Sequence, residues 1–591
     1  MKEVKHKIIS VVVAIVLIVL IVAIAFGKQI KESIANGDEI NGTWFLALIY
    51  PDKYAYSSEQ YDLNEYFKLT SGDDVAIILG DERLEDRALY KDNHVYVTLD
   101  TVSSLFTKRF YYNENEHNLL YSTASDIYRV DLDSLERSYK YGENVNSVDY
   151  VPAVLKGEDV YVALDYVRLF ADFEYTFYAE PNRVEIYNKW ETYKEATLKK
   201  DTNIRYQGGV KSAILTPISE GTKVHVLEQM ENWTKIRTED GYAGYVENDK
   251  LIDLKDATKT PVTGAYNPAD DYQSVSDLEK VSLAWHQIGF TDDGTNLNTV
   301  LLENANINVV SPTWFYLKTE DGTFDNFASA QYVTNAHNKG YKVWGLLEDM
   351  TNEVDEYALF SSTASRTTLI SNLITATINV GADGINVDCE KIGKQTGPHF
   401  VQFLRELSIE AHKNGLVLSC DNYVQNQGNL YYNLNEQGIV CDYVVIMGYD
   451  EHWAGSEPGS VASIGFVEKG IQSSLEAGVP ASKLINGVPF YTRIWKTEGA
   501  NQSSEAVGMD TVQEWMNNRG LKPTWDDECC QNYVKYEDGT AVYQIWIEDK
   551  DSLDAKMSVM SNNNIAGVAV WKLGFENSQA WEAINSYYSG Q

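Results

Sequence analysis

The chain has 591 residues, of which 44% are hydrophobic and 12% aromatic, and its formal net charge is -37 at pH 7. This length exceeds that of one ordinary domain and predicts three or four domains. The negative charge argues against a nucleic-acid partner, because contacts to phosphate need clustered lysine and arginine side chains. The five cysteines show no C-x-x-C spacing, so neither a metal site nor a disulfide framework is predicted.

An apolar segment near the N-terminus is long enough to cross a membrane. Residues 8–26 are interrupted by one polar residue, Ser10, and three lysines precede them. About 20 apolar residues span the hydrocarbon core as a helix, and the basic flank stays in the cytoplasm. We therefore predict a single-pass anchor over residues 1–30, with the rest of the chain on the cell-wall side of the membrane. A cleaved signal peptide is the alternative, because residues 23–25 resemble a cleavage site.

Two segments of the next region repeat each other at an offset of 65 residues. Residues 88–100 align with residues 153–165, and the match continues to Phe110 and Tyr175. Each copy has the pattern of a strand, a short helix and a hairpin. The repeat resembles the copper amine oxidase N-terminal-like domain, although neither copy has a cluster of histidines that would bind copper. We assign residues 31–192 to this module and expect a spacer or a wall-contacting role.

Residues 193–254 show short strands with glycine-bearing turns. Residues 233–237 have a strand pattern, and Gly221 and Gly241 mark turns. This pattern predicts a small barrel and resembles the bacterial SH3 domain. That family implies binding to cell-wall peptides or glycan, with a rigid spacer as the alternative. The polar residues 255–276, which include prolines and a glycine, are predicted to be a linker.

Residues 277–591 alternate strand patterns with helical patterns. Helical patterns lie at residues 366–379, 400–413 and 467–477. Eight strands alternating with helices predict a TIM barrel, an α/β fold, and we expect an inserted α+β subdomain at about 494–562. The candidate strands are residues 281–287, 307–317, 342–347, 384–390, 416–420, 442–447, 483–490 and 566–571.

The segment Asp-Gly-Ile-Asn-Val-Asp-Cys-Glu at residues 383–390 is the clearest chemical motif. Its alternation predicts a buried strand on which Asn386, Asp388 and Glu390 point to one face. Buried carboxylates are costly unless they are hydrogen-bonded or used in chemistry. The segment resembles the D-x-x-D-x-D-x-E signature of family 18 glycoside hydrolases. Asp383, with Gly384 beside it, is expected to hold a helix–strand junction.

Further residues of this family pattern follow other predicted strands. The M-x-Y-D motif is present at residues 447–450, and a tryptophan ends the eighth strand. The motif around Trp314 resembles the spore-germination and cortex-lytic branch of the family. The resemblance assigns these residues to substrate binding: Asn386, Trp571, Met447, Asp450, Tyr491, Arg493 and Trp314.

The resemblance implies substrate-assisted hydrolysis, an exception to the scheme with two catalytic carboxylates. Glu390 would act first as general acid and then as base. Asp388 would hold the N–H of the substrate's acetamido group, Tyr449 would hydrogen-bond the same group, and Trp571 would lie beneath the sugar ring. The family implies neither a metal nor an organic cofactor.

The motif departs from the family pattern at two positions. Asn386 stands where many members have Asp, and Cys389 stands where an aromatic residue is common. Two Asp residues at this spacing share a proton, whereas Asn does not titrate. We therefore expect Asn386 to donate a hydrogen bond to Asp388, and Asp388 to be ionised throughout the neutral range.

Together these features predict a membrane-anchored glycosidase that cleaves β-1,4 linkages in a polymer containing N-acetylglucosamine. Peptidoglycan is the expected substrate, because the upstream modules suit a cell wall. A chitinase or chitooligosaccharide hydrolase is the alternative within the enzyme class. A wall-binding scaffold whose barrel recognises glycan without cleaving it is the alternative from another class.

Overall fold

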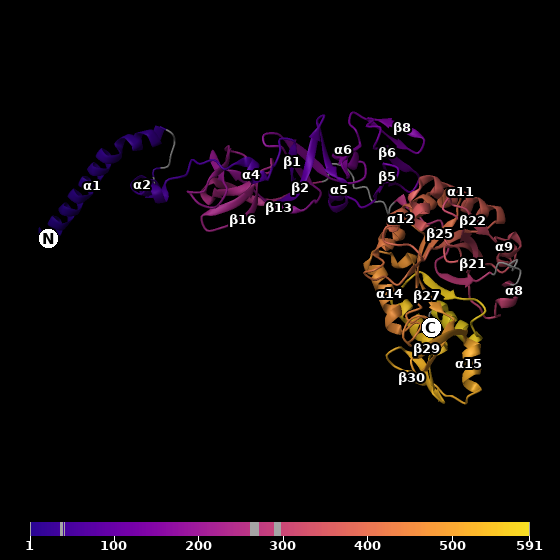
Figure 1. The fold of residues 1–591 in the computed structure, drawn as a ribbon. Helices are drawn as coiled ribbons and strands as arrows, with labels where there is room; N and C mark the ends of the chain where they lie inside the picture. Colours follow the sequence, from indigo (N-terminus) through magenta and orange to yellow (C-terminus); the bar gives the residue numbers. More distant parts are fainter. Residues whose placement is uncertain (1, 36–39, 41, 261–270, 289–296, 590–591) are drawn as a thin grey trace. The chain divides into compact units, whose positions relative to one another are not determined.

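The computed structural model describes residues 2–35, 40, 42–260, 271–288 and 297–589 (Figure 1). The chain divides into two compact units. One comprises Met1–Lys108 and Leu155–Tyr266, and the other comprises Arg109–Val154 and Asn267–Gln591. Residues 261–270 of the predicted linker lie outside the described residues.

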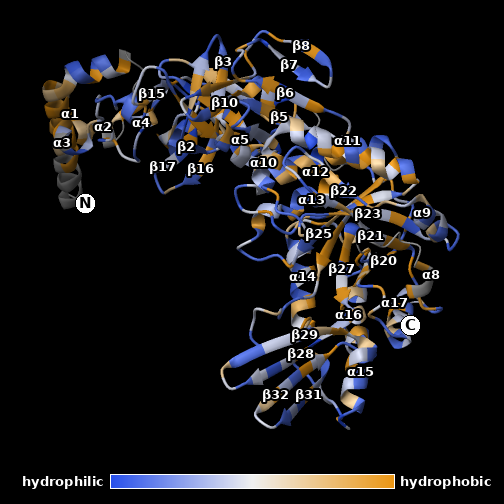
Figure 2. Ribbon diagram, turned by 45° about the vertical axis from the view of Figure 1, so that its right-hand side comes forward, coloured by the Kyte–Doolittle hydropathy of each residue, from blue (hydrophilic) through white to orange (hydrophobic). Residues whose placement is uncertain are grey.

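The chain begins with a long helix, α1 (Lys2–Ala35). Its stretch Val11–Ile34 is long and apolar enough to cross a membrane, and Figure 2 shows hydrophobic residues along much of it. A membrane span and a signal sequence share these properties. Three short helices follow: α2 (Gly42–Ile49), α3 (Pro51–Tyr54) and α4 (Leu63–Phe67).

The repeat contributes most strands of a seven-stranded sheet with the order β11-β12-β1-β2-β3-β10-β9. The equivalent strands of the two copies, β3 (His94–Thr98) and β10 (Asp159–Ala163), pair with each other in antiparallel fashion. Each leads into a helix, α5 (Leu99–Leu105) or α6 (Leu164–Val167). The other strands are β1 (Asp74–Leu79), β2 (Glu82–Lys91), β9 (Ala153–Lys156), β11 (Glu174–Tyr178) and β12 (Arg183–Tyr187).

A second seven-stranded sheet of the same unit has the order β15-β14-β18-β17-β16-β13-β19. Arg237, at the end of β17 (Trp233–Arg237), is fully buried; its Nε lies 2.8 Å from Asp81 Oδ1, and it also hydrogen-bonds Glu185 and Tyr187. A buried guanidinium needs such partners, since desolvation is otherwise uncompensated. The remaining elements are β13 (Thr192–Leu198), β14 (Thr202–Arg205), β15 (Ile214–Ile218), β16 (Lys223–Gln229), β18 (Ala243–Glu247), η1 (Asn248–Lys250) and β19 (Leu251–Thr258).

The second unit contains a closed barrel of eight parallel strands, which confirms the predicted TIM barrel (Figure 1). Closure is shown by the first strand, which pairs in parallel with both the second and the last. All eight predicted strands are present, with small differences at their ends. They are β20 (Val281–His286), β21 (Val309–Leu317), β23 (Lys342–Glu348), β24 (Gly384–Asp388), β25 (Val417–Tyr423), β26 (Tyr443–Met447), β27 (Leu484–Pro489) and β33 (Gly567–Trp571).

Helices surround the barrel and bury its outer face. Ile385 and Val387 of β24 lie in one core with Phe400 and Leu404 of α12, whereas Asn386 points to the barrel interior. The helices and short elements are α8 (Leu297–Val300), β22 (Phe324–Asn326), α9 (Ala330–His337), α10 (Glu356–Ser361), α11 (Thr363–Val380), α12 (Gly397–Lys413), η2 (Leu430–Tyr432), α13 (Leu434–Val440), α14 (Ile464–Glu476), η3 (Ala481–Lys483), α16 (Lys550–Asn562) and α17 (Ser578–Ser589).

An antiparallel subdomain is inserted after β27, as predicted, but it is shorter than expected. Its sheet has the order β29-β28-β32-β31-β30 and ends at Ile547. The following helix α16 packs against α14 and α17 and so belongs to the ring around the barrel. The inserted elements are β28 (Tyr491–Glu498), β29 (Asn501–Gly508), α15 (Met509–Asn517), β30 (Thr524–Asp526), β31 (Gln531–Asp538) and β32 (Ala541–Ile547).

A further five-stranded sheet, β4-β5-β6-β7-β8, packs on the barrel helices within the same unit. Arg109 Nε lies 2.9 Å from Glu436 Oε1 of α13, and the Tyr111 hydroxyl is hydrogen-bonded to His399 Nδ1 of α12 at 2.6 Å. The hairpin of the first repeat copy therefore lies in the barrel unit. The strands are β4 (Phe110–Asn113), β5 (Asn118–Ser122), β6 (Ile127–Asp131), β7 (Ser138–Tyr141) and β8 (Asn144–Ser147).

Candidate active site

Strand β24 carries the acidic motif to the carboxyl end of the barrel. Asn386 is fully buried in the interior, Asp388 is the last residue of the strand, and Glu390 follows two residues later. Cys389 lies in the outer core. The carboxyl ends of the strands are the place where TIM barrels hold their chemistry.

The side-chain amide of Asn386 is held by four hydrogen bonds. Its oxygen accepts from Trp285 Nε1 at 2.9 Å and Ser311 Oγ at 3.0 Å, and its Nδ2 donates to Ser419 Oγ at 3.0 Å and Asp421 Oδ1 at 2.8 Å. Both amide hydrogens therefore form hydrogen bonds with residues of β25. The expectation that Asn386 donates to Asp388 is wrong, because the neighbouring strand supplies better-placed acceptors.

The second carboxylate of the site comes from β25. Asp421 is buried, and burial raises its pKa to about 8 despite the hydrogen bond from Asn386. Burial, together with the negative charges of Asp421 and Glu390, raises the pKa of Asp388 well above its usual range. The expectation that Asp388 titrates as a lone carboxylate is therefore wrong, because Asp421 is a second carboxylate that acts on it. The sequence pattern missed Asp421 because the motif considers only one strand.

Glu390 is partly buried and has two fixed neighbours. The hydroxyl of Tyr423 donates a hydrogen bond to Glu390 Oε2, and the backbone N–H of Glu390 donates to Asp349 Oδ1 at 2.9 Å. Burial raises the pKa of Glu390; the Tyr423 hydroxyl opposes this change, and the negative charge of Asp349 adds to it. A carboxyl with a raised pKa can hold a proton near neutral pH, as a general acid must.

Asp349 is a residue whose role the sequence left open. It follows β23, is almost fully buried, and accepts hydrogen bonds from the backbone N–H groups of Glu390 and Lys391, each at 2.9 Å. Its neighbour Glu348 instead accepts from the backbone of the turn at Met350 and Thr351. Asp349 thus fixes the backbone that carries Glu390, whereas Glu348 fixes its own turn.

The end of β26 and the start of β28 contribute aromatic and charged groups. Tyr449 packs edge-on against Tyr491, with ring centroids 6.3 Å apart. The Tyr491 hydroxyl donates to Asp450 Oδ1 at 2.6 Å, and Arg493 Nη2 lies 3.9 Å from the same oxygen. Met447 is buried in the inner core that also contains Tyr449. These five predicted residues therefore lie together at the same end of the barrel.

Trp285 links the tryptophan of the last strand to the acidic motif. Its indole lies 6.0 Å from that of Trp571 and 6.3 Å from the ring of Tyr449, centroid to centroid. The same indole donates to Asn386. Trp571 is partly buried. The sequence motifs did not include Trp285. Its position near the carboxyl end of the first predicted strand could have indicated that it belongs to the site.

Trp314 does not contact this site. Its side chain is fully buried in the outer core, packed edge-on against Tyr332 of α9 at 5.4 Å between ring centroids. The prediction that Trp314 binds substrate is wrong, because the register of β21 shifts between Thr313 and Phe315 and both aromatic residues end in the outer core. Trp344 and Trp495 are likewise buried.

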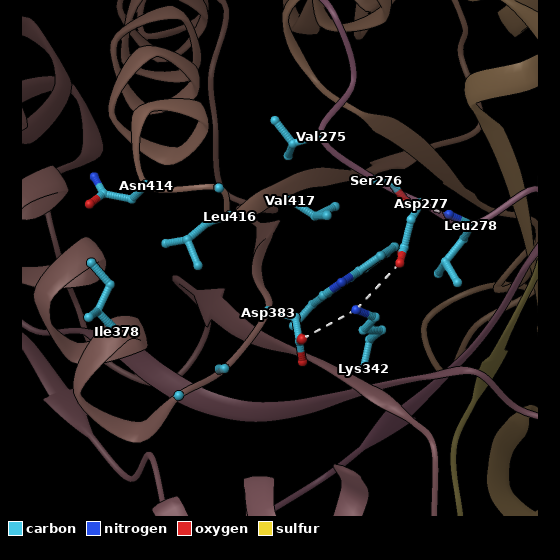
Figure 3. A pocket seen from close by; sticks show the side chains of 14 residues that line it. Val275, Ser276, Asp277, Leu278, Lys342, Ile378, Asp383, Asn414, Leu416 and Val417 are labelled. Atoms are coloured by element: carbon cyan, nitrogen blue, oxygen red, sulfur yellow. Dashed lines mark hydrogen bonds and ion pairs between the residues drawn. The ribbon is translucent and has the colours of Figure 1, made fainter.

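Asp383 lies at the opposite, amino end of the barrel. Its Oδ2 accepts from the backbone of Val343 at 2.8 Å and contacts His337 Nε2 at 2.8 Å. Figure 3 shows it in a pocket of about 430 Å³, where Lys342 lies between Asp383 and Asp277. A Cβ on the adjacent Gly384 would stand 2.6 Å from the carbonyl oxygen of Val417, so the strands pack too closely for a side chain there.

Most of the chain matches one family of known proteins. The family model "Glycosyl hydrolases family 18" matches residues 187–576, more than half of the chain. The uncharacterized glycosylase YvbX of Bacillus subtilis is 23% identical over 317 residues, which cover 50% of this chain and 90% of the relative. The cortical fragment-lytic enzyme of the same organism is 25% identical over 268 residues, which cover 44% of this chain and 59% of that enzyme.

Solved structures with similar folds include the spore cortex-lytic enzyme SleL of Bacillus cereus. It is 20% identical, with a TM-score of 0.48, and the match covers 53% of this chain and 75% of that one.

Proposed function

Because this chain belongs to glycosyl hydrolase family 18, we propose that it hydrolyses β-1,4 linkages in peptidoglycan at N-acetylglucosamine residues. Enzymes of this family act on polymers of N-acetylglucosamine such as chitin or peptidoglycan. The observation that carries the proposal is Glu390 itself, a partly buried carboxyl with a raised pKa at the carboxyl end of a barrel strand. Such a group can protonate a glycosidic oxygen.

The proposed mechanism is substrate-assisted and retains the anomeric configuration. Glu390 protonates the leaving oxygen while the acetamido oxygen of the substrate attacks the anomeric carbon. The glycosidic bond breaks, and a cyclic oxazolinium-like intermediate forms. Glu390, now ionised, takes a proton from water as the water opens this ring. Asp388 holds the acetamido N–H and stabilises the positive charge.

Other residues of the site hold the substrate in this proposal. Tyr449 hydrogen-bonds the acetamido group, and Trp571 lies beneath the sugar ring, where an aromatic face suits its C–H groups. The Asp450–Tyr491–Arg493 cluster is held together by its own hydrogen bond and ion pair and binds sugar hydroxyls. Met447 shares a core with Tyr449. Asn386 holds Trp285, which packs against Tyr449 and Trp571.

The choice of a cell-wall glycan rests on features outside the barrel. One relative is named for lysis of cortical fragments, and the apolar helix Val11–Ile34 suits an anchor that leaves the barrel on the wall side of the membrane. We further propose that the sheet of β13 to β19 is a bacterial SH3-like domain and that residues 31–192 form a copper amine oxidase N-terminal-like module. Both would serve as wall-binding or spacing modules.

The test compares the full chain and its Glu390→Gln variant on purified peptidoglycan and on chitooligosaccharides. Fragments are reduced with borohydride and identified by mass spectrometry. We expect reduced N-acetylglucosamine ends from peptidoglycan with the wild type only. Cleavage of chitooligosaccharides alone would make the protein a chitinase. Sedimentation with walls without any new reducing ends would make it a binding scaffold.

A further inference from the structure

The register of the barrel places Asp421 beside Asp388. In the parallel pair β24–β25, Asn386 lies opposite Ser419 and Val387 opposite Cys420. The next pair in this register is Asp388 and Asp421, and neighbouring strands are about 4.8 Å apart. Each of these two aspartates lies two residues beyond a side chain that points to the barrel interior, so both point inward.

Each of the two carboxyl groups has an oxygen without a partner. Asp388 Oδ1 and Asp421 Oδ2 are buried and have no hydrogen-bond partner among the residues that the structure describes. The other oxygen of Asp421 accepts from Asn386 at 2.8 Å. Two adjacent buried carboxylates repel when both are charged, and a buried oxygen without a donor is costly. One proton held between the two oxygens removes both costs.

The other groups around Asp388 are already engaged or do not supply this proton. On β23, Glu348 lies opposite Asp388, but its oxygens accept from its own turn. Asp349 accepts from two backbone N–H groups, and Glu390 accepts from a hydroxyl of β25. On the β26 side, the charges of Asp388 and Asp421 act on the Tyr449 hydroxyl, and burial raises its pKa well above the usual range, so it stays protonated.

We propose that Asp421 is a positioning residue that shares one proton with Asp388 and so supplies, from the neighbouring strand, the second carboxyl that Asn386 lacks. The inference rests on the proposed function. When the acetamido N–H of a substrate reaches Asp388, the shared proton lies on Asp421 Oδ2 and donates to Asp388 Oδ1. Asp388 carries the negative charge and keeps its other oxygen for the substrate. The pair holds one proton before and after hydrolysis.

The first experiment detects this proton without any substrate. Infrared spectra of the full chain, labelled with [4-13C]aspartate, are recorded for the wild type and for Asp421→Asn. At pH 7 we expect a protonated aspartic acid band in the wild type that disappears near pH 8, the pKa of Asp421, and is missing in the variant. The same spectrum in both proteins would overturn the proposal.

The second experiment separates the shared proton from a structural role. An asparagine at position 421 still accepts from Asn386 and can donate to Asp388, as the protonated acid does. Asp421→Asn should therefore lose about 3- to 10-fold in kcat/KM, whereas Asp421→Ala, which leaves buried partners unpaired, should lose about 10- to 100-fold. In the wild type we expect a fall in activity above pH 8 that Asp421→Asn no longer shows. A purely structural Asp421 would leave this pH profile unchanged.

Two further variants complete the test. The double variant Asn386→Asp, Asp421→Asn places the titrating carboxyl on β24 instead of β25. In this variant we expect the fall in activity above pH 8 to reappear. Ser419→Ala removes a hydrogen-bond partner of Asn386 that does not titrate. This variant should have lower activity and still show the fall in activity above pH 8. If the wild type cleaves no glycan, the proposed function fails, and the infrared result still decides whether the proton is shared.

Discussion

Strand β24 has an aspartate at each end, Asp383 just before its first residue and Asp388 as its last. Asp383 accepts from a backbone N–H and pairs with His337. Asp442, before β26, likewise accepts from the backbone of Leu418 and contacts His412 Nε2 at 3.0 Å. Asp388 instead has a buried oxygen without a partner among the described residues.

This difference shows in the direction of the pKa shifts. Burial acts to raise the pKa of Asp442, but the hydrogen bonds from His412 and Leu418 bring it below its usual range. The pKa of Asp388 is raised by burial and by the charge of Asp421. An aspartate thus stabilises the fold at the amino end of the barrel, where Asp442 lies. At the carboxyl end, where Asp388 lies, an aspartate lowers the stability of the fold. Incomplete satisfaction of buried acids is typical of functional sites.

The largest effect at the carboxyl end is expected from Glu390→Gln. Glutamine has no proton to transfer, so hydrolysis should fall about 1,000-fold. The rate of formation of new reducing ends from peptidoglycan measures this loss. As a control, Glu410→Gln changes a half-exposed glutamate of α12 and should leave the rate unaltered. Activity of the Glu390 variant above a tenth of the wild type would remove Glu390 from the role of general acid.

Asp349→Asn should have the next largest effect. An amide offers one acceptor oxygen in place of two, so one of the backbone N–H groups of Glu390 and Lys391 loses its partner and Glu390 shifts. Misplacement of a catalytic group by about 1 Å costs on the order of 100-fold; we expect about 10- to 100-fold in kcat. Asp355→Asn, which alters the cap of α10, is the matched control and should affect thermal stability alone.

At the amino end, Asp442→Asn is expected to lower stability rather than activity. Hydrogen bonds to a charged group contribute about 1.5–3 kcal/mol, so we expect a loss of about 2 kcal/mol at pH 7 in urea unfolding. The folded-state pKa of Asp442 is lowered, so its contribution is present above about pH 4 and is lost as the pH falls further. The difference between variant and wild type should therefore shrink toward pH 3. An increase at low pH would contradict this assignment.

The smallest expected effect is a gain in stability, in the variant Asp388→Asn. Because the folded-state pKa of Asp388 is raised, the wild type loses stability as the pH rises from its unfolded value of about 4 through the neutral range. Asp388→Asn removes this dependence and should be more stable than the wild type by about 1 kcal/mol at pH 8, with a smaller gain at pH 5. Thermal unfolding at the two pH values measures it. A variant that is less stable at pH 8 would show that Asp388 stabilises the barrel.

The two copies of the repeat show where reasoning from sequence stops. Their hydrophobic patterns align at a constant offset of 65 residues, and each does form a strand, a helix and a hairpin. Yet the first hairpin packs on the barrel helices, and the second pairs with β1. At the offset of 65, Arg109, Tyr111 and Asn113 correspond to a glutamate, a threonine and a tyrosine, which lack the groups that bond the barrel helices.

Local patterns in the sequence were sufficient to predict the strands and helices of the barrel. Hydrophobic alternation located all eight barrel strands and the apolar N-terminal helix, because burial and backbone geometry act over a few residues at a time. It also placed Asp388, Glu390, Tyr449 and Trp571 at one end of the barrel, since the carboxyl ends of parallel strands meet there.

The side chains that face each other across neighbouring strands could not be predicted from these local patterns. Trp285 and Asp421 join Asn386 from strands that are distant in sequence, and Asp349 reaches the backbone of Glu390. A shift of register within β21 turned Trp314 into the outer core. These partners depend on register and barrel closure, which arise from the packing of the whole sheet and leave no local pattern in the sequence.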